Sequence, residues 1–115
     1  MSRLRKLEEI NVETGLKYCI DDEELYLEAL RMYVGGDKRD VLGKCLAESN
    51  FENYRVHVHA LKSTSLNVGA ESLSAEAKKL EFACRDENFE LVREKHSELM
   101  ERYGKLLERL AEIIS

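Results

Sequence analysis

The chain has 115 residues, 43% hydrophobic and 36% charged, with a formal net charge of −5. This length suits one domain over residues 1–115, with a core large enough to fold without disulfides or metal. The acidic balance argues against a nucleic-acid binder that works through charge, and against direct binding to anionic membranes. We expect residues 1–9 either to fray or to lie along the surface of this domain.

Two further features bear on the compartment. No apolar run approaches the ~20 residues that span a bilayer, and the first nine residues lack the apolar stretch of a signal peptide. The three cysteines, Cys19, Cys45 and Cys84, include no close pair, which argues against a disulfide framework and against a zinc site. We therefore expect a cytoplasmic domain whose cysteines act as small buried hydrophobes.

The composition predicts helices. Proline is absent, and leucine, glutamate, lysine and alanine are frequent, as in helices joined by short turns. A short first helix is expected over 10–18, weakened by Gly15. A second opens at the acidic cluster 21–24 and ends at the glycine pair 35–36. Asp37 is expected to cap a third.

The second half of the chain contains three longer predicted helices. Asn53 is expected to cap the first of them. This helix is expected to stop at Gly69, because helices commonly end at a residue in the left-handed backbone conformation, which glycine adopts easily. Ser72 is expected to cap the next, and residues 86–88 turn the chain into a last helix over 89–114. Four substantial helices with short connections predict an all-α fold, an antiparallel four-helix bundle with additional short N-terminal helices.

The helix that stops at Gly69 carries a histidine on its outer side. If Leu61 is the centre of the buried face and each residue turns the helix by about 100°, His59 lies roughly 160° from that centre. Ser63 and Leu66 lie beside it, and Lys62 lies on one flank. His59 should therefore face water or a partner.

An exposed imidazole beside a lysine can carry chemistry. Imidazole is both a nucleophile and a proton acceptor near neutral pH, and Lys62 could offset the negative charge of an incoming phosphoryl group. Ser63 is small enough for another protein to approach closely, and Val56 and Leu66 add apolar surface for docking. The residues alone leave open the alternative that an exposed histidine does nothing.

Other candidate chemistry is weaker. His57 is predicted at the margin of the core, partly buried and hydrogen-bonded, and it points away from its neighbour His59, so the two cannot share a metal. His96 falls on the apolar stripe of the last helix and is expected to be a core or boundary residue. The hydroxyls of residues 63–65 have no base partner, which argues against a serine hydrolase. No metal, phosphate-loop or nucleotide motif is present, so we expect no metal site and no cofactor.

The run His59–Ala70 resembles the signature of histidine-containing phosphotransfer (HPt) domains. That signature is His-x-Leu-Lys-Gly, followed by Gly-Ala seven and eight residues after the lysine. The chain matches it except at Ser63, where the family usually has glycine. The resemblance covers roughly residues 10–114 and includes three further stretches, 14–16, 22–26 and 80–84.

This resemblance implies a phosphorelay intermediate and not an enzyme. His59 would accept a phosphoryl group from an aspartate of a receiver domain and pass it to another receiver, and the receiver would supply Mg²⁺. The implied partners are response-regulator receiver domains and a hybrid sensor histidine kinase. The chain itself is expected to be a monomer, since one active helix per carrier suffices.

The resemblance also implies roles for two residues of the following helix. Glu81 would accept a hydrogen bond from one nitrogen of the imidazole, whereas the residues alone favour a solvated surface acid at this position. Arg85 would either pair with Glu81 or add positive charge near the phosphate, and Arg55 would join the docking surface.

Two alternative functions stay open. The chain could be a helical adaptor that binds a partner through the His59 face without chemistry, and Ser63 is the feature that favours this. An enzyme with its own small-molecule substrate is a more distant alternative, since no pocket chemistry can be read from the sequence.

Overall fold

Helices account for about four fifths of residues 1–114, the part of the chain that the computed structural model describes. There is no strand among these residues. The helices, in chain order, are α1 (Ser2–Arg5), α2 (Val12–Tyr18), α3 (Glu23–Gly35), α4 (Arg39–Ala47), α5 (Phe51–Asn67), α6 (Glu71–Arg85) and α7 (Phe89–Ile114).

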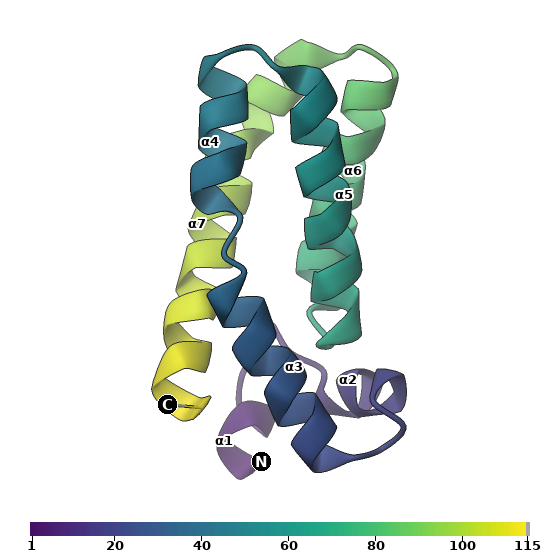
Figure 1. Ribbon diagram of the computed structural model, residues 1–115, viewed down its shortest axis with the longest axis vertical. Coiled ribbons are helices and arrows are strands. Elements are labelled where there is room, and N and C mark those ends of the chain that lie inside the picture. The colour runs from purple at the N-terminus through teal and green to yellow at the C-terminus, as the bar shows by residue number, and fades with distance from the viewer. Residues whose placement is uncertain (115) are drawn as a thin grey trace.

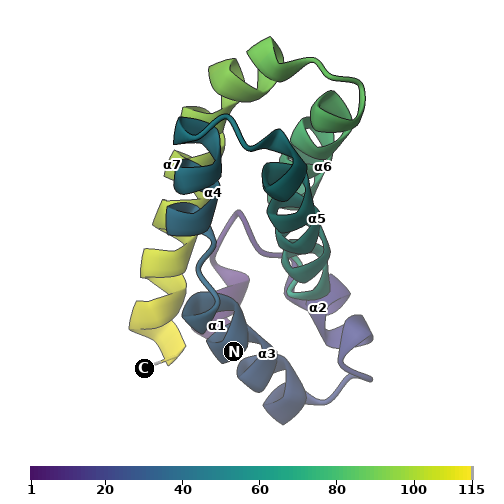
Figure 2. The same cartoon turned by 45° about the horizontal axis from the view of Figure 1, so that its top comes forward.

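Four of these helices run side by side in alternating directions. Helices α4, α5 and α6 and the first part of α7 form an antiparallel bundle at one end of a molecule whose longest extent is 40 Å, and α7 continues to the other end (Figure 1). Helix α3 continues the line of α4 toward the other end, where α1 and α2 lie (Figures 1 and 2). The predicted all-α bundle with short N-terminal helices is therefore confirmed. No helix within residues 1–114 combines the length and the apolar character that crossing a membrane would require.

Two buried tyrosines of α3 hold the C-terminal half of α5 in place. The hydroxyl of Tyr26 donates to the backbone oxygen of Val68 at 2.8 Å, and the hydroxyl of Tyr33 shares a hydrogen bond of 2.7 Å with Ser65 Oγ. A buried hydroxyl without a partner is costly, so these contacts define how α3 and α5 pack together.

Gly69 ends α5 as predicted. Its φ of +89° lies in the left-handed region, which a residue with a Cβ rarely adopts. Its carbonyl accepts a hydrogen bond from the backbone N–H of Asn11 at 2.8 Å, and a Cβ at this position would clash with the backbone oxygen of Asn11. The end of α5 is thus joined directly to the segment before α2.

Two predicted caps are wrong. The cap of α5 is Asn50, not Asn53, because the side chain of Asn50 accepts the backbone N–H of Asn53 at 3.2 Å. Helix α6 starts at Glu71 with Ala70 as its cap residue, so Ser72 already lies inside the helix. Its hydroxyl instead accepts a hydrogen bond of 2.8 Å from Arg102 of α7.

Two other helix starts differ slightly from the prediction. The first predicted helix begins at Val12 and not at residue 10, because the side chain of Asn11 accepts the backbone N–H of Thr14 at 3.2 Å. Asp37 does accept the backbone N–H of Arg39, at 2.9 Å, although the residue in the cap position of α4 follows it in the chain.

Candidate functional site

Helix α5 presents His59 on the outer side of the bundle. Tyr54, Val58, Leu61 and Ser65 of the same helix are completely buried, so their stripe sets the inward face of α5. His59 lies away from that stripe, and its side chain is 56% exposed. The outward direction predicted from helical periodicity is therefore confirmed.

A carboxylate from the neighbouring helix reaches both His59 and Lys62. Glu81 of α6 places Oε2 2.6 Å from Nδ1 of His59, and its Oε1 lies 2.7 Å from Nζ of Lys62. The Glu81 side chain is only 11% exposed and that of Lys62 is 23% exposed, so both are shielded by the groove between the two helices. The three side chains form one connected cluster, which we call the His59 cluster.

The electrostatics of the His59 cluster keep Glu81 ionised. Burial by itself would raise the pKa of the Glu81 carboxyl. The contacts with Lys62 and with His59 outweigh burial and lower that pKa below its ordinary value of 4.5, because both partners favour the charged carboxylate. Glu81 is therefore an acceptor of hydrogen bonds, and not a donor, at neutral pH.

This charge state determines which imidazole nitrogen is free. A carboxylate can only accept, so Nδ1 of His59 must carry the proton in the hydrogen bond of 2.6 Å. In the neutral imidazole the other nitrogen, Nε2, then keeps its lone pair. The cluster can thus present an oriented nitrogen nucleophile on an exposed surface.

The residues predicted for docking surround the cluster on α5. Val56 is 60% exposed, and Arg55 and Ser63 are exposed as well. Leu66 was expected on the surface but is half-buried. It still borders the His59 face, with less apolar area available to a partner.

Arg85 does not pair with Glu81. Its guanidinium Nε lies 3.0 Å from Oδ1 of Asp86, and the guanidinium also lies over the ring of Phe82, 4.4 Å from the ring centroid. The carboxylate of Glu81 is already occupied by two partners on α5, so the exposed Asp86 takes its place.

Phe82 is a surface residue of this face that the sequence pattern did not single out. The ring is 37% exposed and directly follows Glu81 in α6. The signal that could have identified it is the placement of Lys78 and Arg85 about one helical turn away on either side, which is the spacing of side chains that touch on a helix surface.

The other histidines lie outside the cluster. His57 is half-buried as predicted, and no hydrogen bond joins its ring to another side chain or backbone group within residues 1–114. His96 of α7 is half-buried, and its Nδ1 lies 2.9 Å from the hydroxyl of Tyr54. Burial lowers the pKa of His96, in keeping with the boundary position expected for it.

The cysteines and acids of the described residues form no metal centre. No group of three or more histidine, cysteine or acidic side chains within residues 1–114 is arranged to hold an ion. Cys45 and Cys84 are buried and Cys19 is half-buried. Burial raises the pKa of the Cys84 thiol to about 11, against a smaller opposing effect of Arg55, so this thiol stays protonated near neutral pH.

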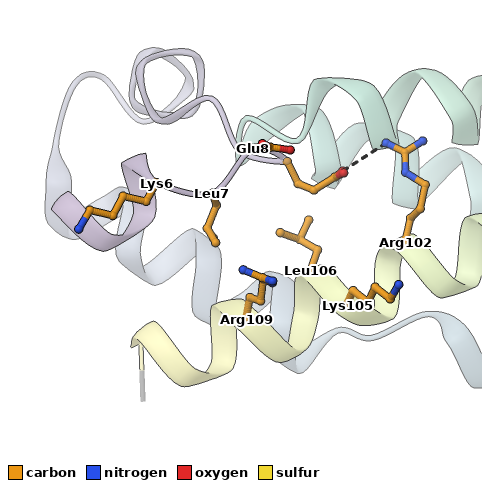
Figure 3. A pocket seen from close by; sticks show the side chains of 8 residues that line it. Lys6, Leu7, Glu8, Arg102, Lys105, Leu106 and Arg109 are labelled. Atoms are coloured by element: carbon orange, nitrogen blue, oxygen red, sulfur yellow. Dashed lines mark hydrogen bonds and ion pairs between the residues drawn. The ribbon is translucent and has the colours of Figure 1, made fainter.

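A hollow of about 530 Å³ lies elsewhere, between the N-terminal segment and α7. Figure 3 shows Leu7 and Leu106 among the side chains that line it. Arg102, which also lines the hollow, forms an ion pair of 3.2 Å with Glu9. None of its lining residues belongs to the His59 cluster. The exposed imidazole of His59 therefore lies on the open surface of α5 and α6, away from this hollow.

Comparison with known proteins places these features in a family. No curated protein and no solved structure matches the chain significantly. The family model described as "Hpt domain" matches residues 17–113, which is most of the chain and includes every residue of the His59 cluster. The chain therefore belongs to the Hpt domain family, the helical domains that carry out histidine phosphotransfer in phosphorelays.

Proposed function

We propose that this chain is a phosphorelay intermediate in which His59 accepts a phosphoryl group from the aspartate of one receiver domain and passes it to another. The observation that carries the proposal is the His59 cluster, in which a shielded carboxylate holds an exposed imidazole and a lysine at once. Family membership supports histidine phosphotransfer, and the cluster singles out His59 from the other two histidines.

The transfer step follows from the orientation of the imidazole. Nε2 of His59 attacks phosphorus with its lone pair, the bond from phosphorus to the aspartyl oxygen breaks, and its electrons stay on the receiver's carboxylate. The proton remains on Nδ1, so the phosphorylated ring is cationic, and Glu81 stabilises it through the existing contact. Onward transfer reverses these bond changes with a second receiver.

Lys62 contributes positive charge near the reacting phosphorus. It lies three residues after His59 on α5, so the two side chains are neighbours on the helix surface. Its ammonium is held by Glu81 before a partner arrives. A phosphoryl group on Nε2 would offer this ammonium a second anionic partner and lower the cost of the charge that develops during transfer.

The partner completes the reaction. We propose that the receiver domain brings both the aspartate and the Mg²⁺, and that this chain contributes no metal or nucleotide site. Response-regulator receivers and a hybrid sensor histidine kinase are the proposed partners, and the cytoplasm is the proposed location. The face formed by the exposed Arg55, Val56 and Ser63 and the half-buried Leu66 is the proposed contact surface on α5.

The experiment is a transfer assay with a receiver domain phosphorylated by acetyl phosphate. The wild-type chain should become labelled, and the label should be labile in acid and stable in alkali, as expected of phosphohistidine. His59→Gln should abolish labelling and keep the helical circular dichroism spectrum. His57→Gln is the matched control, since this histidine lies two residues away on the same helix, and it should be labelled like the wild type.

The same assay separates the alternative function. A helical adaptor would bind the receiver through the His59 face and acquire no label. Labelling that survives in His59→Gln but disappears in His57→Gln would instead show that the acceptor has been assigned to the wrong histidine.

A further inference from the structure

Two of the large apolar side chains exposed on this protein belong to the two helices that carry the His59 cluster. Val56 of α5 is 60% exposed and Phe82 of α6 is 37% exposed. The other large exposed apolar residues of the described chain lie on α2, α3 or the turn between them: Tyr18, Ile20, Leu25 and Met32. Val56 and Phe82 are thus the large exposed apolar side chains of the two helices that form the His59 cluster.

The ring of Phe82 is held in place by two cations of its own helix. The guanidinium of Arg85 lies 4.4 Å from the ring centroid, and Nζ of Lys78 lies 5.4 Å from it. Asp86 in turn holds the guanidinium, with an oxygen 3.0 Å from Nε of Arg85. An aromatic side chain ordered before binding loses less conformational freedom when a partner covers it.

The position of Phe82 relative to the imidazole follows from helix geometry. On α5, Val56 and Lys62 lie three residues before and three residues after His59, so they flank it on opposite sides. Lys62 is on the side of α6, because its ammonium pairs with Glu81. Phe82 follows Glu81 in α6 and is turned about 100° further around that helix, so it lies on the exposed side of α6 beyond the carboxylate, whereas Val56 lies on the other side of the imidazole.

We propose that Phe82 is an anchor for the docking of receiver domains, with Lys78 and Arg85 against its ring and Val56 on the opposite side of His59. This inference rests on the proposed function, since it assigns a role in the recognition of the same partner. The receiver surface it fits has an apolar contact beside the phosphorylated aspartate, with carboxylates near enough to meet the two cations.

Charge supports this choice of partner. The chain has a net charge of −5, so most of its surface repels an acidic protein. The flank around Phe82 carries two cations, Lys78 and Arg85, against the one carboxylate of Asp86 that pairs with Arg85, so it is less acidic than the chain as a whole and would draw an acidic receiver surface toward His59. Phe82 and its two cations would thus both orient the receiver domain on the His59 face and favour receivers with an acidic docking surface.

The test measures phosphotransfer as a function of receiver concentration. The receiver is phosphorylated with acetyl phosphate, and the variants are Phe82→Ala, Phe82→Leu and Met32→Ala. Phe82→Ala should raise the receiver concentration at half-saturation about tenfold, the size of effect typical of a buried aromatic anchor. The transfer rate at saturation should stay unchanged, because Phe82 does not touch the imidazole.

The controls separate docking from folding and from chemistry. Met32 is a large apolar residue, 72% exposed, on α3, and Met32→Ala should match the wild type. Phe82→Leu keeps apolar area without the aromatic face and should recover part of the loss. Direct phosphorylation of the histidine by phosphoramidate should proceed equally in wild type and Phe82→Ala, since this small donor needs no docking.

A failure of the Phe82 anchor can be distinguished from a failure of the proposed transfer to His59. Identical saturation curves for wild type, Phe82→Ala and Met32→Ala would overturn the anchor while leaving the transfer to His59 intact. If the wild type accepts no phosphoryl group, the proposed function fails, and calorimetric titration of receiver into wild type and Phe82→Ala decides the anchor: weaker binding by the variant supports it, and equal affinities overturn it.

Discussion

Glu81 Oε2 on α6 lies 2.6 Å from Nδ1 of His59 on α5, while the other oxygen of the same carboxylate pairs with Lys62. A single shielded acid thus sets both the tautomer of the proposed nucleophile and the position of the neighbouring cation. Substitutions that remove the Glu81 carboxylate, neutralise its charge or remove Lys62 should therefore have different effects on phosphotransfer and on stability.

Glu81→Ala should slow phosphotransfer to His59 roughly tenfold. The variant loses a charge-assisted hydrogen bond worth about 1.5 kcal/mol or more, and about 1.4 kcal/mol corresponds to tenfold in rate. Nitrogen NMR of the His59 ring should show a larger fraction of the tautomer with its proton on Nε2. An unchanged tautomer ratio with an unchanged rate would exclude Glu81 as a positioning residue.

The stability of the protein should depend on the charge of Glu81 in acid. Its pKa is lowered in the folded state, so the carboxylate stabilises the fold above its ordinary pKa of 4.5, and this contribution is lost as the pH falls through the lower folded value. Denaturant unfolding of wild type and Glu81→Gln at a series of pH values measures it. The advantage of the wild type should be complete at neutral pH and shrink below about pH 4.5. A constant difference across the series would contradict the predicted linkage.

Lys62→Ala should slow transfer about tenfold at saturating receiver, with the fold unchanged. The ammonium offsets negative charge on the phosphoryl group during the reaction, and removing one such donor typically costs at least that much. Lys62→Met keeps most of the apolar stem and should be equally slow, whereas Lys62→Arg should recover part of the rate. Equal rates in wild type and Lys62→Ala would remove Lys62 from the mechanism.

Ser63→Gly should leave docking intact. Serine and glycine are both small, so the half-saturating concentration of receiver should change by less than about threefold, with about 0.5 kcal/mol lost from helix stability. Ser63→Leu should raise that concentration by about tenfold or more, because a large side chain one turn from His59 keeps the receiver away. A Ser63→Leu variant that docks normally would place the contact surface elsewhere.

Gly69→Ala should destabilise the protein by about 1–3 kcal/mol. Position 69 has a φ of +89°, and the added Cβ would clash with the backbone of Asn11. Gly43→Ala is the matched control, because Gly43 lies inside α4 and an added methyl group there would meet open space. That change should raise the free energy of unfolding by about 0.5–1 kcal/mol, and urea unfolding measures both variants.

Much of the helix pattern could be predicted from the sequence. Apolar residues recur at helical spacing along α5 and α7, and Gly69 marks a stop that only a residue without a Cβ tolerates easily. The caps were less predictable. Asparagine is a favoured cap residue, so Asn50 and Asn53 are both candidates. The choice depends on which side chain accepts a backbone N–H of the first helical turn, and in the structure Asn50 accepts that of Asn53.

The ion pair of Arg85 shows a second limit of prediction from the sequence. Arg85 has acidic neighbours at positions 81 and 86, and spacing along one helix favours the first. The structure selects Asp86, since Glu81 is already bound to α5. Competition for a carboxylate by residues distant in the chain cannot be read from local spacing.

The outward direction of His59 beside Lys62 could be read from the amino-acid order, because the direction of a side chain on a helix depends only on its position relative to the buried stripe. The family resemblance implied the contact between Glu81 and His59, but the shielding of Glu81 and its second contact, with Lys62, could be seen only in the folded chain. Which residue of α6 lies opposite His59 depends on how the two helices pack and on the turn at Gly69 that joins them. Those relationships are set by the core as a whole, and not by any one segment of the chain.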